Sequence, residues 1–220
     1  MLAKELISDE VPPLKITDNG SRALKWMEEF RVSHLPVVKG TEFIGLLSDT
    51  DLLDLNSVKQ NIANLKINLS KAFVFENQHV FEVLKIISAQ HLSVIPVLDE
   101  QKKYKGVVTA RRLMQIIADM PFVNEPGAII MLEMNDHDYS MAQIAQIVEG
   151  NDAKILSAYI TARYEQGKIE VTLKVNKEDL SGIIQTLNRY NYTIKASFQQ
   201  SSFEEDIKRR FDSFMNYLNV

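Results

Sequence analysis

The sequence has no cysteine, and its 220 residues include only eight glycines, six prolines and one tryptophan. Without cysteine, a disulfide framework, a thiolate metal site and a cysteine nucleophile are excluded. The four histidines are scattered with no i, i+4 pair, at His34, His79, His91 and His137. We therefore expect no metal site. No nucleophile elbow, Gly-rich phosphate loop or paired-carboxylate motif accompanies them, so we expect neither an enzyme nor a catalytic cofactor.

Long apolar runs are also missing. Residues 1–16 lack the apolar stretch of a signal peptide, and no run approaches the roughly 20 apolar residues that a membrane helix needs. We therefore expect a cytoplasmic protein without a membrane partner. A formal net charge of −4, with no concentrated basic surface in the sequence, argues against a nucleic-acid partner. The length, with 45% hydrophobic residues, favours more than one globular domain.

The first half of the chain is a tandem duplication. Residues 33–53, SHLPVVKGTEFIGLLSDTDLL, recur as residues 93–114, SVIPVLDEQKKYKGVVTARRLM. Pro36 and Pro96 are 60 positions apart, and Gly45 and Gly106 are 61 apart, which indicates a turn one residue longer in the second copy. Such repeats are the first feature to establish in a sequence. Neither copy is large enough to bury its apolar face alone, so we expect the two to pack together.

Each copy predicts a helix, two strands and a second helix. The apolar spacing and the turn residues place the first helix at 23–30, strands at 35–38 and 42–47, and a helix from Asp49. In the second copy they place a helix at 80–89 and strands at 94–98 and 104–108. Ser48 and Thr109 fall where a strand passes into a helix, which is the N-cap position and also a place where an anion meets free backbone N–H groups.

Both copies carry an amphipathic helix, then an apolar-Pro-Val-apolar strand, a turn, and a Gly-containing strand that ends in Ser or Thr. This doubled pattern resembles the CBS domain, named after cystathionine beta-synthase, which usually occurs in pairs. The resemblance covers residues 1–120 and implies two β-α-β-β-α units joined through their sheets. It also implies two clefts, which in many relatives bind AMP, ATP or S-adenosylmethionine. Such modules are usually regulatory.

The first cleft is predicted around the sequence GLLSDTD. The carboxylate of Asp51 can accept hydrogen bonds from two vicinal hydroxyls, which makes it the candidate ribose ligand. Ser48 can donate to a phosphate or sugar oxygen at the helix N-terminus, and the backbone from Leu46 to Ser48 would lie along the nucleotide. By resemblance, the adenine side comes from the other copy, at Ala72, Ser93 and Val94. The alternative is structural: Ser48 is an N-cap and Asp51 is a first-turn acid that favours the helix dipole.

The second cleft departs from this pattern, because Arg112 stands where the first copy has Asp51 and is preceded by Arg111. A guanidinium has donors only, so it cannot accept ribose hydroxyl groups, but it suits a phosphate. Two alternatives follow. Either the cleft is empty and Arg112 pairs with a nearby acid, or Arg112 binds the phosphate of a nucleotide held otherwise by Pro12, Ser33 and Thr109.

Beyond Pro121 the pattern changes to strand, helix, strand, strand, helix, strand. We expect these elements at 128–134, 141–148 with Ser140 as the cap, 155–162, 168–175, 180–187 and 192–198. This is the ferredoxin-like order, and in a chain with a CBS pair it resembles an ACT domain, a module that commonly dimerises and binds amino acids or other small metabolites. Relatives often have Gly after the first strand, where this chain has Asn135 to Tyr139. Within that loop, Asp136, His137 and Asp138 are ligand-type residues, which are more often solvated than metal-bound.

The predicted fold is therefore α+β / α/β: a tandem CBS pair, a ferredoxin-like βαββαβ domain of ACT type and a terminal helix. The domains are expected at 1–62, 63–121 and 128–200, with a linker at 122–127 and an amphipathic helix at 201–220. Along the terminal helix runs an apolar stripe of Phe203, Ile207, Phe211, Phe214 and Leu218. Such a stripe docks on its own domain or on a second copy, and we expect a homodimer.

The function expected from these features is the sensing of an adenine nucleotide, of the AMP, ATP or S-adenosylmethionine class, by a cytoplasmic regulatory protein. The ACT-like domain would serve dimerisation or sense a small metabolite. The layout resembles that of acetoin-utilisation-type CBS/ACT regulatory proteins. The alternative is a non-catalytic interaction module with vestigial clefts that acts on a partner protein. The sequence names neither the nucleotide nor the downstream target.

Overall fold

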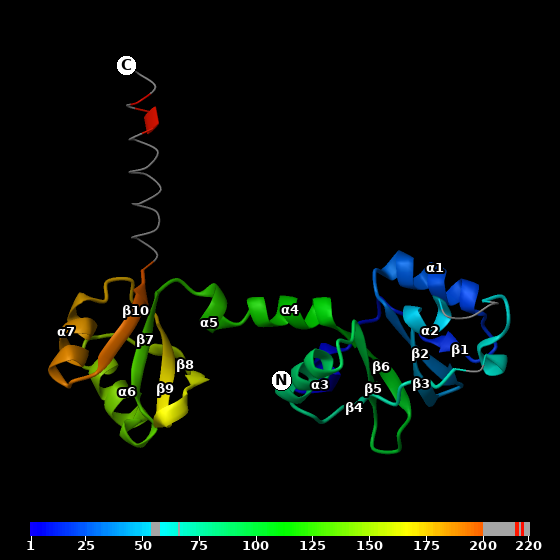
Figure 1. The fold of residues 1–220 in the computed structure, drawn as a ribbon, viewed down its shortest axis with the longest axis horizontal. Helices are drawn as coiled ribbons and strands as arrows, with labels where there is room; N and C mark the ends of the chain where they lie inside the picture. The colour runs from blue at the N-terminus through cyan, green and yellow to red at the C-terminus, as the bar shows by residue number, and fades with distance from the viewer. Residues whose placement is uncertain (54–57, 66, 200–213, 216, 218–220) are drawn as a thin grey trace. The chain divides into compact units, whose positions relative to one another are not determined.

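A computed structural model describes residues 1–53, 58–65, 67–199, 214, 215 and 217. The chain divides into two compact units, residues 1–118 and residues 119–220 (Figure 1). The first unit contains the duplicated half. None of the helices in the described part of the chain has the length and apolarity needed to cross a bilayer.

Both repeats of the first unit build a three-stranded sheet in the same order. In the first, β1 (Leu14–Lys15) pairs parallel with β2 (His34–Lys39), which pairs antiparallel with β3 (Glu42–Ser48). In the second, β4 (Val74–Phe75), β5 (Val94–Leu98) and β6 (Tyr104–Thr109) repeat that arrangement. The helices are α1 (Gly20–Phe30), α2 (Asp49–Leu53), α3 (Val80–Ala89) and α4 (Ala110–Ala118). The predicted mixed α+β fold and the duplication are confirmed.

One helix begins earlier than its apolar spacing predicts. Helix α1 starts at Gly20 because Asn19 precedes it as N-cap, where its side-chain oxygen accepts a hydrogen bond from Arg22 N at 2.9 Å. The apolar spacing marks only the residues that face the core, so it could not locate a polar first turn.

The segments that lead into the two repeats are exchanged between them. Before the first repeat, η1 (Ala3–Leu6) lies on the second: Ala3 N donates to Gln78 O at 2.8 Å. Before the second repeat, η2 (Ile62–Asn64) lies on the first, with a bond of the same length from Ile62 N to Asp18 O. Ala3 and Ile62 are both buried. Each repeat therefore completes its core with a segment that precedes the other, which makes the first unit one folding unit.

Two glycines make this exchange possible. A Cβ on Gly45 would lie 2.5 Å from the Leu69 Cβ, and a Cβ on Gly106 would lie 2.5 Å from the Ile7 Cγ2. Both glycines have positive φ, 159° and 151°. The lead-in segments can therefore pass closely over the sheets only where no side chain is present.

The second unit is a four-stranded antiparallel sheet in the order β10-β7-β9-β8. Its strands are β7 (Ala128–Asn135), β8 (Ile155–Arg163), β9 (Lys168–Val175) and β10 (Thr193–Phe198), and the helices of the repeating pattern are α6 (Met141–Glu149) and α7 (Ser181–Arg189). The alternate residues Ile130 and Leu132 of β7 and Val171 and Leu173 of β9 are fully buried with Ile144 of α6. The arrangement is consistent with the predicted ferredoxin-like domain.

Two segments of the second unit need separate mention. Residues 122–127 were predicted as a linker, but helix α5 (Pro121–Asn124) occupies the start of that segment, with Pro121 in the first turn, where a missing N–H costs nothing. The predicted helix at 201–220 lies outside the described residues except for 214, 215 and 217.

Candidate functional site

The junction between β3 and α2 places Ser48 and Asp51 together. Ser48 N donates to Asp51 Oδ2 at 2.9 Å, and Asp51 N donates to Ser48 Oγ at 3.1 Å. This reciprocal pair is a capping box, so both side chains stabilise the start of α2. Ser48 Oγ also lies 2.8 Å from the Thr50 hydroxyl. The other Asp51 oxygen, Oδ1, has no hydrogen-bond partner among the described residues, so it is available to accept from a ligand.

The equivalent junction between β6 and α4 has only half of this arrangement. Arg112 N donates to Thr109 Oγ1 at 3.0 Å, so Thr109 is the N-cap of α4. The Arg112 side chain cannot return a hydrogen bond to the backbone N–H of Thr109, because a guanidinium has no acceptor. Arg112 also makes no salt bridge within the described part of the chain. The alternative in which Arg112 pairs with an acid thus has no support among the described residues, and the side chain lies beside a separate pocket that includes Asp9 and Gln115.

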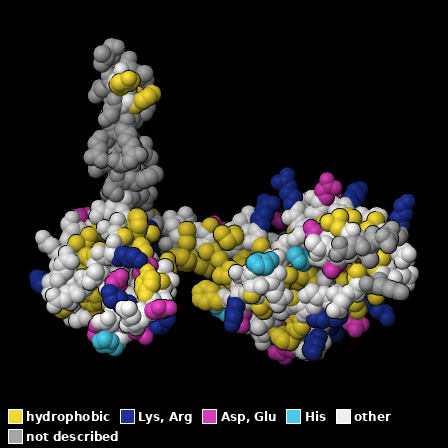
Figure 2. Space-filling model, in the orientation of Figure 1, with side chains coloured by type: hydrophobic (Ala, Val, Ile, Leu, Met, Phe, Trp, Pro, Cys, Tyr) yellow, Lys and Arg dark blue, Asp and Glu magenta, His cyan; other side chains and the backbone are white. Residues whose placement is uncertain are grey.

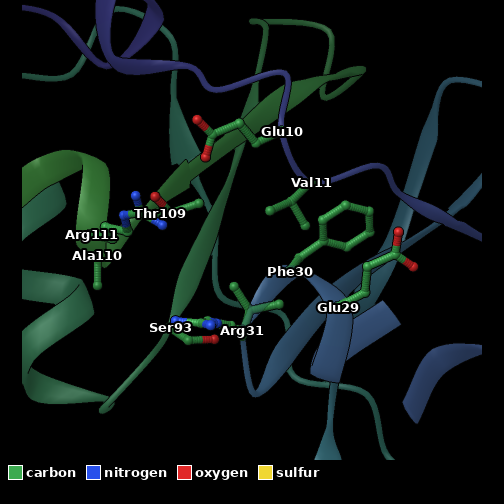
Figure 3. Close-up of a pocket in the computed structure, with 10 residues that line it drawn as sticks. Glu10, Val11, Glu29, Phe30, Arg31, Ser93, Thr109, Ala110 and Arg111 are labelled. Carbon is green, nitrogen blue, oxygen red and sulfur yellow. The ribbon is translucent and has the colours of Figure 1, made fainter. Parts of the chain in front are cut away.

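A cavity of about 780 Å³ lies between the two repeats at this second junction (Figure 3). Its walls come from the first lead-in segment, from the end of α1 and from the start of α4. The lining residues are Glu10, Val11, Glu29, Phe30, Arg31, Val32, Ser93, Thr109, Ala110 and Arg111. This volume is within the range of small-molecule sites, roughly 300–1,000 Å³.

Charged side chains of both signs line this cavity. Arg31 follows α1 in the first repeat, whereas Arg111 belongs to the first turn of α4 in the second repeat. Figure 3 shows the Glu10 carboxylate on the same side of the cavity as Thr109 and Arg111. Glu29 is the second acid of the lining. The cavity therefore combines donors for an anion with acceptors for hydroxyl or amino groups and an apolar wall that includes Phe30.

Ser93 joins the two repeats beside this cavity. Its Oγ accepts hydrogen bonds from Ser33 N and from His34 N, each at 3.0 Å. The Ser33 hydroxyl lies 3.0 Å from His34 Nδ1. The sequence-predicted residues Ser33 and Ser93 are thus brought together, but the Ser93 hydroxyl is engaged by the backbone of the first repeat and the Ser33 hydroxyl by the ring of the adjacent His34.

The other predicted residues of the first cleft are held by local contacts. Leu46 and Ser70 exchange two backbone hydrogen bonds, of 2.8 and 3.1 Å, so the main chain of Leu46 is already paired. Ala72 N donates to Ser70 Oγ at 3.3 Å, and Val94 is buried in β5. Pro12 directly follows Val11 of the cavity wall. Leu46, Ser48, Asp51, Ala72 and Val94 do not line the cavity at the second junction.

His34 is the titratable group between the two junctions. Burial lowers the pKa of its imidazole below the usual value, and the carboxylates of Asp49 and Asp51 partly oppose this by favouring the charged ring. The two acids belong to the first junction, so His34 is electrostatically coupled to that side.

The predicted loop of the second unit uses its acids locally. Asp136 pairs with Arg163 at 2.9 Å, while Asp138 accepts from the Asn135 amide at 2.8 Å. Asp138 also lines a separate cavity of about 380 Å³ together with Gln143 and Tyr192. Within the described ranges, no group of His, Asp and Glu side chains is placed to hold a metal ion.

Sequence reasoning missed Arg31, Glu10 and Glu29 as cavity residues, and it gave Arg112 the place that Arg111 takes. Arg31 lies in a left-handed turn after α1, outside the repeated motif. The signal that could have found it is the contrast between repeats, because the equivalent position 60 residues later is His91.

Comparison with known proteins found one family model and several solved structures that are similar to this chain. A model of the CBS domain family matches residues 3–57 and 68–119, once on each repeat. Similar solved structures include a CBS domain pair/ACT domain protein from Thermotoga maritima, 22% identical, which covers 54% of this chain and 98% of its own with a TM-score of 0.48. CBSX2 in complex with AMP is 19% identical and covers 53% of this chain and 95% of its own, with a TM-score of 0.46. The CBS domain of a bacterial CNNM/CorC family Mg²⁺ transporter in complex with ATP is 20% identical. It covers 54% of this chain and 87% of its own, with a TM-score of 0.43.

The two repeats are therefore CBS domains, and the chain carries them as a tandem pair. CBS domain pairs are regulatory, nucleotide-binding modules and are typically non-catalytic.

Proposed function

We propose that this chain is a cytoplasmic, non-catalytic regulatory protein that senses an adenine nucleotide, of the AMP, ATP or S-adenosylmethionine class, between its two CBS domains. The observation that carries the proposal is the cavity of about 780 Å³ that both repeats line. Because its walls come from both domains, a bound ligand would link the repeats and could change their relative stability. That is what a sensor requires.

The lining chemistry supports a nucleoside as the ligand. Phe30 and Val11 offer apolar surface for a base, while Glu10 and Glu29 offer carboxylates that can accept from ribose hydroxyl groups or an exocyclic amine. These acids supply at the second junction the acceptor role that Arg112 cannot.

The first junction stays a second proposed site. Asp51 would accept ribose hydroxyl groups through its Oδ1, while Oδ2 continues to accept from Ser48 N. The proposal for this cleft is the weaker of the two, because the backbone of Leu46, expected beside the nucleotide, is already paired with Ser70.

Ligand-dependent melting tests the proposed function. A ligand that binds only the folded protein, at about 100 times its dissociation constant, adds roughly 2.7 kcal/mol to the free energy of unfolding. We expect such a shift with at least one of AMP, ATP and S-adenosylmethionine, and none with inosine or cytidine analogues at the same concentration. The variant Ala110→Trp, which fills the cavity, should lose the shift. Ala118→Trp, on the same helix outside the cavity, is the matched control and should keep it.

A homodimer is the proposed assembly. Exposed apolar side chains gather over α3 and α4 (Figure 2), where Phe81 is 67% exposed and Met114 is 64% exposed. Leu84 on α3 adds to the same surface. Exposed apolar patches usually mark an interface, and this one supports contact with a second copy. Sedimentation at micromolar concentration tests it: Phe81→Ser with Met114→Ser should shift a dimer towards monomer, and a wild-type monomer would contradict the assembly.

The second unit is proposed to be an ACT-like domain for dimerisation or metabolite sensing. The sheet order β10-β7-β9-β8 supports this. The alternative to sensing is an interaction module with vestigial clefts, and the mutual capping of Ser48 and Asp51 favours it for the first cleft. Under that alternative, none of the adenosine ligands would shift the melting temperature.

A further inference from the structure

One histidine lies at the crossing where the two CBS domains meet. His34 is the first residue of β2, and Ser93 directly precedes β5 of the other domain. Ser93 Oγ accepts from Ser33 N and from His34 N at 3.0 Å each, and Ser93 N donates to His34 Nδ1 at 3.3 Å. The equivalent position of the second repeat is Val94, whose side chain forms no hydrogen bonds. The crossing therefore has a titratable group from one domain only.

These bonds require a ring whose Nδ1 carries no proton. The Ser93 N–H can only donate, so Nδ1 must accept from it. The hydroxyl groups of Ser33 and Ser93 lie 3.0 and 3.2 Å from the same nitrogen. Two backbone N–H groups already use both lone pairs of Ser93 Oγ, so its O–H is left to donate. The neutral ring therefore carries its proton at Nε2.

A proton on Nδ1 would replace these attractions by a repulsion. It would face the Ser93 N–H directly, and Ser93 Oγ has no lone pair left to accept it. The Ser33 hydroxyl alone could turn to accept, which would still leave the Ser93 N–H opposite a second N–H in a half-buried site. If the crossing opens, water can solvate both groups. The protonated ring therefore favours an open crossing.

The charges around the ring set the pH range. Burial lowers the pKa of His34, and the carboxylates of Asp49 and Asp51 on α2 partly oppose this. On the other side of the crossing, Arg31 and Arg111 line the cavity that Ser93 also lines, and cations there do not favour a charged ring. In the closed crossing the ring is therefore neutral at neutral pH and takes up a proton only below the ordinary value of 6.5.

The crossing is tied to both strand-to-helix junctions. Asp49 N donates to Ser33 O, and Ala110 N donates to Ser93 O, each at 2.9 Å. These two N–H groups belong to the first residues of α2 and α4. A displacement of Ser33 or Ser93 would therefore be passed to the start of a helix, and through Ala110 to the wall of the cavity.

We propose that His34 is a proton-sensitive fastener between the two CBS domains: the neutral ring closes the crossing, and protonation opens it. The pH is then a second input to the regulatory pair, beside its ligand. This inference goes beyond nucleotide sensing and depends on the crossing alone, so its test needs no nucleotide.

Two NMR measurements on the full chain test the fastener. The first is the tautomer: at neutral pH the Nδ1 signal of His34 should be that of an unprotonated nitrogen. The second is hydrogen exchange of the Ser93 amide, corrected for its intrinsic dependence on pH. Because opening takes up one proton, the open crossing should become roughly tenfold more populated for each pH unit between 6.5 and the pKa of the closed state.

A variant and a matched control identify the titrating group. His34→Asn keeps a side-chain oxygen that can accept from Ser93 N and does not titrate, so exchange of the Ser93 amide should lose its dependence on pH. His91→Asn makes the same substitution at an exposed histidine of the same unit, with φ 53°, a conformation that Asn tolerates. This control should keep the wild-type dependence.

The contrary outcomes are equally specific. A proton on Nδ1 at neutral pH, or corrected Ser93 exchange that is constant with pH in the wild type, would overturn the fastener whether or not His34→Asn folds. Persistence of the dependence in folded His34→Asn, or its loss in His91→Asn, would assign the proton to another group and also overturn it. None of these results bears on the nucleotide proposal, which is tested separately by ligand-dependent melting.

Discussion

The two strand-to-helix junctions of the CBS pair have the same scaffold and opposite chemistry. At the first, Ser48 and Asp51 exchange hydrogen bonds and place a carboxylate at the start of α2. At the second, Thr109 caps α4 alone, and Arg111 and Arg112 follow it. The first junction therefore presents a carboxylate of which one oxygen is already used in the cap, whereas the second presents cations without a salt-bridge partner among the described residues.

The difference shows which positions a duplicated fold holds constant. Gly45 and Gly106 both admit a lead-in segment, and Arg31 and His91 share one backbone conformation, because these positions fix the path of the chain. The side chains that face the clefts are free of that requirement. They have diverged, and we infer that the two clefts differ in the ligand they take.

The largest expected effect tests the shared scaffold. Gly45→Ala and Gly106→Ala should each destabilise the first unit by roughly 2–4 kcal/mol, because each adds overpacking to a positive φ. Chemical denaturation measures this. Gly40→Asn is the control, because Gly40 has φ 64° with open space around it and Asn tolerates this conformation. Destabilisation by only one of the two alanines would contradict the equivalence of the scaffolds.

The neighbours of these glycines sharpen that test. The Cβ of Gly106→Ala meets the Ile7 Cγ2, which Ile7→Ala removes, so the double variant should be less destabilised than the two single effects combined. The Cβ of Gly45→Ala meets the Leu69 Cβ, which Leu69→Ala keeps. We therefore expect the second substitution to offset the destabilisation at Gly106 only, which lies in the second repeat. An equal offset at Gly45 would mean that the lead-in segments shift as rigid strands.

The next effect concerns Asp51. If its carboxylate holds ribose hydroxyl groups in the first cleft, Asp51→Ala should weaken nucleotide binding there by roughly 1.5–3 kcal/mol, and a 2′-deoxy nucleotide should lose much of the same energy. If Asp51 serves the capping box alone, the variant costs about 1 kcal/mol of stability and leaves affinity unchanged. Calorimetry and denaturation on one variant distinguish the two roles.

A smaller difference is expected between the caps. Ser48→Ala removes the Oγ that accepts from Asp51 N but keeps Ser48 N, the donor to Asp51 Oδ2, whereas Thr109→Ala removes one acceptor in a buried site. Each should cost about 1 kcal/mol. A double-mutant cycle should find coupling between Ser48 and Asp51 but none between Thr109 and Arg112, and coupling at the second pair would refute the contrast.

The smallest effect follows from His34. Burial holds the pKa of the folded state below the unfolded value of 6.5, so the unfolded chain binds the proton more readily. The stability from neutral His34 is complete above that value and is lost as the pH falls through the folded-state pKa. As the pH is lowered, the melting temperature of the wild type should therefore fall more steeply than that of His34→Gln. Asp51→Ala should lower the pKa of His34 further, and an unchanged NMR titration would contradict the coupling.

The sequence alone predicted most of the regular structure, because hydrophobic periodicity and turn residues are local signals. The strand at Lys168–Val175, the helix at Val80–Ala89 and the Ser140 cap, which accepts from Gln143 N, appear where the pattern placed them. The exchange of lead-in segments was not predictable, because it is carried by backbone hydrogen bonds that any residue can make.

The cavity at the second junction could not be predicted from the sequence either. Its walls come from the end of α1 in one repeat and the start of α4 in the other, so no single motif contains them. Arg112 stands in register with Asp51 and drew the prediction, yet the neighbouring Arg111 lines the cavity. Register in a repeat identifies equivalent backbone positions, and it does not identify which of two adjacent helical side chains faces a cleft.

Titration calorimetry of ATP into the full chain tests the central claim most directly. The account predicts one tight ATP site per chain, with that site abolished in Ala110→Trp and retained in Asp51→Ala. Two equal sites per chain, or a single site that Asp51→Ala removes and Ala110→Trp does not, would show that the first junction binds the nucleotide and would contradict the assignment to the cavity between α1 and α4.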